Sequence, residues 1–161
     1  MKQNDLLFEG SDWLFGFRSA GILLYQDQVL LQRGENDQEF ALPGGHVVFG
    51  ETSDRAVVRE FQEELGVEIH VQRLLWIEEL FWAWNNKNAH SLCHYYLVSL
   101  SDDSRLPENG IIRSLESDES RLLFQWVKID KLNQYPIYPS FFKTEIHHLS
   151  KEIKHFITYD V

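Results

Sequence analysis

Residues 45–67 read GHVVFGETSDRAVVREFQEELGV, and this stretch carries most of what the sequence says about the fold. It predicts a helix over residues 53–65, with Thr52 or Ser53 as the capping residue at its start. Gly66 stands where a glycine commonly ends a helix. Apolar side chains recur along one side of this predicted helix: Val57, Val58, Phe61 and Leu65. We therefore expect that side to be buried.

Three carboxylates share a different side of the same helix. Glu60, Glu63 and Glu64 stand at positions i, i+3 and i+4, which are neighbours on a helix surface. Such like charges repel by roughly 0.2–0.5 kcal/mol per pair when exposed. The group is either a solvated acidic surface, the usual meaning of such clusters, or a site for a hard divalent cation. Carboxylate oxygens suit Mg²⁺ or Mn²⁺.

The segments around this helix predict a layered α/β domain. Segments rich in β-forming residues predict strands over residues 15–25, 29–32, 67–84, 90–100 and 123–129. A second helix is predicted from Pro139 to about Lys154. The order of strands, helix, strands, helix indicates a mixed sheet with helices packed on it. We expect residues 1–161 to form a single domain.

Composition narrows the class of protein. The 161 residues are 43% hydrophobic, which is enough for a packed core, and the formal net charge is −10. A chain this acidic is not expected to bind nucleic acid backbones, which require a basic surface. The single cysteine, Cys93, excludes an internal disulfide, and no apolar run approaches the roughly 18 residues of a membrane span. We therefore expect a cytoplasmic protein without a membrane partner.

The spacing of fixed residues adds a family resemblance. They fall in the order Gly45, Glu51, Arg59-Glu60, Glu63-Glu64 and Gly66, with an apolar residue at each hydrophobic position. This pattern resembles the complete Nudix box of small bacterial Nudix hydrolases, and Ala41–Gly45 and Leu30–Arg33 resemble the segments that precede it. The resemblance implies an α/β/α sandwich, a mixed sheet flanked by helices, with a loop–helix–loop active site.

The resemblance also implies roles for the box residues. The Gly45 carbonyl, Glu60 and Glu64 are expected to bind Mg²⁺, with Mn²⁺ possible. Glu63 would ligate metal or act as the general base. Arg59 would brace Glu63 or reach Glu51, which would hold the loop onto the helix.

The reaction implied is hydrolysis of a nucleoside diphosphate linked to another moiety. In that reaction metal ions draw charge off phosphoryl oxygens and lower the pKa of a bound water. The base can also lie outside the box, and its candidates there are Glu78, Glu79, Glu116 and Glu119. The alternative is a Nudix-like domain that senses a nucleotide without cleaving it. The expected partner is a nucleotide or nucleotide sugar, and a homodimer is possible.

The sequence gives weaker evidence for substrate-binding residues than for the residues of the box. Aromatic residues crowd residues 76–84, and most are expected in the core. Trp82 or Phe81 is the best candidate to stack on a base, and Arg33 the best to meet a phosphate. The ADP-ribose branch of the family usually carries a proline soon after the box. No proline lies between Pro43 and Pro107, which makes ADP-ribose a less expected substrate.

Overall fold

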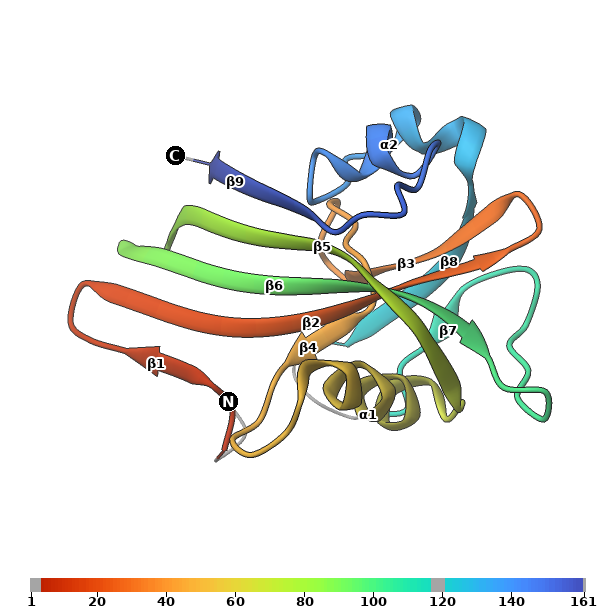
Figure 1. Cartoon of the computed structure of the whole chain (residues 1–161), viewed down its shortest axis with the longest axis horizontal. Coiled ribbons are helices and arrows are strands. Elements are labelled where there is room, and N and C mark those ends of the chain that lie inside the picture. The colour runs from red at the N-terminus through yellow and green to blue at the C-terminus, as the bar shows by residue number, and fades with distance from the viewer. Residues whose placement is uncertain (1–3, 117–120, 161) are drawn as a thin grey trace.

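The computed structural model describes residues 4–116 and 121–160 (Figure 1). Its strands are β1 (Leu7–Glu9), β2 (Trp13–Tyr25), β3 (Gln28–Gly34), β4 (Gly44–His46), β5 (Ile69–Trp84), β6 (Lys87–Leu100), β7 (Ile112–Arg113), β8 (Leu122–Lys128) and β9 (Lys154–Asp160). Its helices are α1 (Ser53–Leu65), the 3-10 helix η1 (Ile129–Gln134) and the short α2 (Phe142–Glu145).

The strands form one mixed sheet, as the sequence predicted. Their order is β7-β8-β3-β2-β6-β5-β9, and β1 and β4 add to the edge of β2. The β2–β6 and β5–β9 pairs are parallel, whereas the other pairs are antiparallel. Asn85 and Asn86, with φ of 47° and 62°, make the tight turn between β5 and β6. Asparagine tolerates this left-handed conformation better than most residues do.

Helical segments cover the sheet on both sides, as in an α/β/α sandwich. The apolar stripe of α1 packs on one face, where Val57 and Phe61 join a buried cluster with Leu23 of β2. On the other face, Phe142 of α2 and Leu132 of η1 belong to a second buried cluster. Figure 1 shows α1 and α2 on opposite sides of the strands. The sheet is therefore buried between two cores.

The position of α1 depends on a close approach to β2. A Cβ atom added at Gly21 would lie 2.8 Å from Cε2 of Phe61 and 3.1 Å from Cγ2 of Val57. Gly66 ends the helix in the left-handed region, with φ of 67°, and its N–H donates to the Gln62 carbonyl at 3.0 Å. The predicted helix bounds of residues 53–65 are confirmed.

The second predicted helix, Pro139 to about Lys154, is wrong. Only Phe142–Glu145 form a helix, and Lys154–Asp160 form the strand β9. Residues 156–159 of β9 are Phe, Ile, Thr and Tyr, all of which favour strands, and β5 offers them a sheet edge to pair with. Phe156 of β9 then stacks on Phe141 with ring centroids 3.8 Å apart. Tertiary pairing therefore outweighs the local helical pattern.

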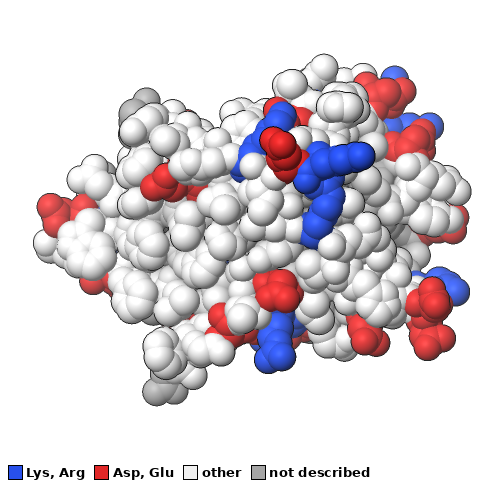
Figure 2. Space-filling model, in the orientation of Figure 1, with Lys and Arg blue, Asp and Glu red and all other residues white. Residues whose placement is uncertain are grey.

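One end of the sheet is apolar at its surface. Phe8, Trp13, Trp84 and Tyr159 are all more than two-fifths exposed, and they lie on β1, β2, β5 and β9. Figure 2 shows a broad uncharged area where these strands extend beyond α1. A homodimer stays a prediction. Among the described residues, no helix is long and apolar enough to cross a membrane.

Candidate active site

Arg59 ties the loop before α1 to the helix itself. Its Nε donates to Glu51 Oε1 at 2.9 Å, and its Nη2 donates to Glu51 Oε2 at 3.1 Å and to the His46 carbonyl at 2.9 Å. Glu51 also accepts the Val48 N–H at 3.2 Å. The hydrogen bonds that Arg59 donates to Glu51 raise the pKa of Arg59 above its usual value, so the guanidinium stays charged.

The same guanidinium reaches two carboxylates of the helix. Arg59 Nη1 lies 2.7 Å from Glu60 Oε1 and 3.2 Å from Glu63 Oε2. Glu60 and Glu64 are only 7% and 5% exposed, whereas a third of the Glu63 side chain meets solvent. Of these three carboxylates, Glu63 is therefore the most open to water.

Gly45 approaches this group from strand β4. A Cβ atom there would lie 2.4 Å from the carboxyl carbon of Glu60, so a side chain at this position would displace the Glu60 carboxylate. Strand β4 is held by pairing with β2, where Gly45 faces Ser19 and Gly44 faces Ala20. The backbone of the glycine pair and the Glu60 carboxylate consequently share one small space.

The donor set suits a hard cation, although the side chains are not arranged around one. Glu51, Glu60, Glu63 and Glu64 supply only oxygen atoms, and oxygen is what Mg²⁺ and Mn²⁺ prefer. Among residues 4–116 and 121–160, no group of three His, Cys, Asp or Glu residues converges as a ready metal site. Glu60 and Glu63 are instead drawn to Arg59.

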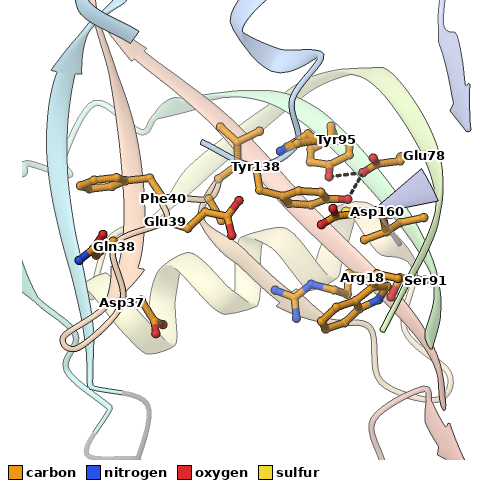
Figure 3. Close-up of a pocket in the computed structure, with 17 residues that line it drawn as sticks. Arg18, Asp37, Gln38, Glu39, Phe40, Glu78, Ser91, Tyr95, Tyr138 and Asp160 are labelled. Atoms are coloured by element: carbon orange, nitrogen blue, oxygen red, sulfur yellow. Dashed lines mark hydrogen bonds between the residues drawn. The ribbon is translucent and has the colours of Figure 1, made fainter. Parts of the chain in front are cut away.

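A pocket of about 640 Å³ begins where the loop leading to Gly45 leaves the sheet. Residues 37–42 form part of its wall, and Arg18, Leu80 and Cys93 of the sheet also line it (Figure 3). The next residue, Pro43, accepts the Gly21 N–H at 2.8 Å and so fixes this wall to β2. The pocket and the carboxylate group are therefore connected along the chain.

A buried carboxylate organises the deep side of the pocket. Glu78 has no exposed surface, and its Oε2 accepts the hydroxyls of Tyr95 at 2.7 Å and Tyr138 at 2.9 Å. Its Oε1 accepts the Thr158 hydroxyl at 2.7 Å. Burial, followed by nearby negative groups, raises the pKa of both tyrosines, so these hydroxyls keep their protons. Burial also raises the pKa of Cys93 to about 12.

The two aromatic candidates lie on opposite faces of the sheet. Trp82 lines the pocket, and its indole Nε1 is buried without a hydrogen-bond partner among the described residues. Phe81 faces away and stacks on His90 and Tyr159, with centroids 4.3 Å and 5.0 Å apart. Trp76, expected in the core, is 1% exposed.

Arg33 is used by its own loop. Its Nη1 donates to the carbonyls of Gly34, Glu35 and Asp37 at 3.1–3.2 Å, and its guanidinium lies 5.6 Å from the Phe40 ring centre. These contacts stabilise the turn that follows β3. A phosphate contact from Arg33 stays a prediction.

The remaining candidates for the general base, Glu79 and Glu116, lie in different parts of the structure. Glu79 contacts His155 at 2.8 Å on the face opposite the pocket. Glu116 follows Leu115, whose N–H donates to the Glu64 carbonyl at 2.8 Å, so its loop lies against the end of α1. Glu119 lies outside the described residues. Among the described candidates for the base, Glu116 is therefore the one in a loop that contacts the end of α1.

Sequence reasoning missed several pocket residues, among them Arg18, Glu39, Tyr138 and Asp160. Arg18 carried a signal, because a charge in the middle of an apolar strand is costly unless it has a use. The others carried none, since only the folded chain brings residues 39, 138 and 160 to one cavity.

Comparison with solved structures agrees with the fold. A NUDIX hydrolase from Nitrosomonas europaea aligns with a TM-score of 0.62 and 15% identity, covering 99% of this chain and 82% of that one. A mutator MutT protein from Bacillus halodurans aligns with a TM-score of 0.61 and 21% identity, covering 90% and 91%.

Comparison of sequences identifies the family. An ADP-ribose pyrophosphatase from Methanocaldococcus jannaschii is 45% identical over 58 residues, which are 34% of each chain. A putative ADP-ribose pyrophosphatase from Bacillus subtilis, YjhB, is 30% identical over 83 residues, which are 50% of this chain and 38% of that one. The matched region thus spans little more than a third of either relative. The NUDIX domain model matches residues 17–144, so this chain belongs to the NUDIX family.

Proposed function

We propose that this protein is a metal-dependent pyrophosphohydrolase that cleaves a nucleoside diphosphate linked to another moiety. The carboxylate group centred on Arg59, set against Gly45 and connected along the chain to a pocket wall, carries the proposal. Family membership and the printed names of the relatives support the reaction class. We propose Mg²⁺ as the cofactor, with Mn²⁺ as a substitute.

Electrostatics explains why a cation is needed. Three carboxylates, those of Glu51, Glu60 and Glu63, contact the single guanidinium of Arg59, so acidic side chains outnumber the basic one in this group. A diphosphate would add further negative charge to the same place. A divalent ion would be held by Glu60, Glu64, Glu63 and the Gly45 carbonyl. When bound, it would withdraw charge from phosphoryl oxygens and make a bound water more acidic.

The protein's own residues then have separate tasks. Glu60 and Glu64 are buried and are suited to hold the ion, since burial fixes their geometry. Glu63 is the more exposed acid and is suited to take a proton from the attacking water. Arg59 is a positioning residue that links Glu51, Glu60 and Glu63. Glu116 is the second candidate for the base.

The test is a panel of nucleoside triphosphates, nucleotide sugars and dinucleoside polyphosphates with Mg²⁺, analysed for diphosphate cleavage. Glu63→Gln and Glu64→Gln each keep the side-chain shape, and each should remove most turnover while thermal unfolding stays near that of the wild type. Asp103→Asn, an exposed acid outside this site, is the matched control. Full activity in both glutamine variants would refute the assignments. If Glu63→Gln stays active and Glu116→Gln does not, the base is Glu116.

A further inference from the structure

Arg18 is a cation in the wall of the pocket, and it has no partner among residues 4–116 and 121–160. It is half-buried on the central strand β2, and its guanidinium makes no hydrogen bond or ion pair with another described residue. Charges that leave water are normally paired, because desolvation is costly. Figure 3 shows this guanidinium directed into the cavity. Its position therefore suits a ligand that presents hydrogen-bond acceptors.

Carboxylates face the same cavity from other walls. Glu39, in the segment before the glycine pair, and Asp160, at the end of β9, point into the space below the Tyr138 ring (Figure 3). Neither carboxylate has a hydrogen bond or ion pair within the described chain. Together with Asp37, these acids outnumber Arg18, so the cavity disfavours a phosphate group. The group that it accepts should be uncharged and should carry N–H donors as well as acceptors.

The floor of the pocket suits a flat ring. Cys93 pairs in register with Arg18 on one side and with Glu78 on the other, which places those two backbones about 10 Å apart. The small side chain of Cys93 leaves room above the sheet between them. Glu78 fixes the hydroxyl of Tyr138, whose ring covers this space. The buried indole N–H of Trp82 is one more donor without a partner among the described residues.

The geometry points to selection of guanine as the base of the substrate. Guanine offers O6 and N7 to an arginine fork, and its N1–H and N2–H₂ groups suit carboxylates. Adenine has an amino group in place of O6, so a donor would face the Arg18 donors. Uracil has a single N–H, and cytosine lacks the paired O6/N7 edge. This inference rests on the proposed function for its setting, although base binding can be measured without catalysis.

The experiment measures binding and turnover separately. Calorimetry gives the Kd of GMP, AMP, CMP and UMP, and kcat/KM is measured for GTP, ATP, CTP and UTP with Mg²⁺. The wild type should favour guanine over adenine by about 10-fold to 100-fold, the range expected for one bidentate contact. Arg18→Met should bring that ratio close to one while values for adenine change little. Arg18→Lys should fall between, because lysine keeps the charge but loses the fork.

Asp160→Asn and Glu39→Gln should each weaken the binding of GMP more than the binding of AMP. Arg113→Met, an exposed arginine paired with Glu35 outside the pocket, is the control and should leave all ratios unchanged. Equal binding of GMP and AMP by the wild type, or preference for CMP, would overturn the inference. An equal loss of affinity for all four nucleotides in Arg18→Met and Arg18→Lys would also overturn it, because Arg18 would then contact the phosphate or ribose that the nucleotides share. If no nucleotide is cleaved but GMP binds selectively, the proposed function fails and this inference stands.

Discussion

Arg59 and Glu51 form a two-point ion pair across the loop that enters α1, with Nε–Oε1 and Nη2–Oε2 distances of 2.9 and 3.1 Å. Eight residues separate them in sequence, so this contact closes the loop onto its own helix. The remaining nitrogen, Nη1, is left for Glu60 and Glu63. One planar side chain thereby sets the positions of three carboxylates.

Replacing this fork should damage catalysis more than folding. Arg59→Lys keeps one charge, but a single ammonium cannot reach Glu51, Glu60, Glu63 and the His46 carbonyl together. We expect kcat to fall by about 100-fold, the scale of misplacing catalytic groups by an ångström. Steady-state kinetics on the best substrate tests this, with Arg55→Lys on the exposed side of α1 as the control. A decrease of less than threefold would contradict the positioning role.

The hydroxyl of Tyr95 should contribute to stability through Glu78. Tyr95→Phe removes a fully buried donor to a carboxylate, and hydrogen bonds to charged groups contribute about 1.5–3 kcal/mol. We expect urea denaturation to show a loss of that size. The matched control is Tyr25→Phe, whose hydroxyl donates to Glu108 at the surface, and it should change the free energy of unfolding much less than Tyr95→Phe does. Equal effects of the two variants would show that burial does not decide the contribution.

His46 should make stability depend on pH. Burial, assisted by Arg18, lowers the pKa of His46 to about 4, whereas the unfolded chain binds the proton near 6.5. Between these values the unfolded state holds more protons, so stability falls as pH drops from about 6.5 to about 4. His94, whose pKa burial also lowers, acts in the same direction.

The difference between wild type and His46→Gln isolates this effect from the other titrating groups. The free energies of unfolding of the two proteins at pH 7.5 serve as the reference. By pH 4.5 the free energy of unfolding of the wild type should have fallen by up to about 3 kcal/mol more than that of the variant. Chemical denaturation at half-unit pH steps provides the curve. Parallel curves for the two proteins would contradict the prediction, because they would show that His46 binds its proton equally well in the folded and unfolded states.

Gly21 should not tolerate a side chain. Gly21→Ala places a methyl group against the buried ring of Phe61, which packs α1 on the sheet. Overpacking of this kind costs about 1–3 kcal/mol. Gly110→Ala is a control of a different kind, because open space surrounds that Cβ and only its φ of +82° is unfavourable. Rescue of Gly21→Ala by Phe61→Leu, measured by thermal unfolding, would establish the steric cause, whereas additive losses would exclude it.

The sequence determined the local features. Residues 53–65 fold as the predicted helix because the apolar stripe and Gly66 agree within one short segment, although Thr52, at the N-cap position, makes no side-chain cap hydrogen bond. The carboxylates at i, i+3 and i+4 could be placed on one side by helical geometry alone, and so could the contact from Arg59 to Glu63 four residues later. The strands predicted over residues 15–25, 67–84 and 90–100 followed from the same kind of local pattern, and the structure has them at 13–25, 69–84 and 87–100.

Tertiary structure decided what depends on distant partners. The segment after Pro139 has a helical pattern, yet its end becomes β9 because the edge of β5 offers backbone hydrogen bonds that no local pattern encodes. The pocket joins Arg18, Glu39, Tyr138 and Asp160, although positions 18 and 160 lie far apart in the sequence. Glu78, one of the predicted candidates for the base, is buried and accepts hydrogen bonds from three hydroxyls on three segments. Spacing in sequence fixes neighbours on one element, whereas burial and partner choice arise only when the elements pack together.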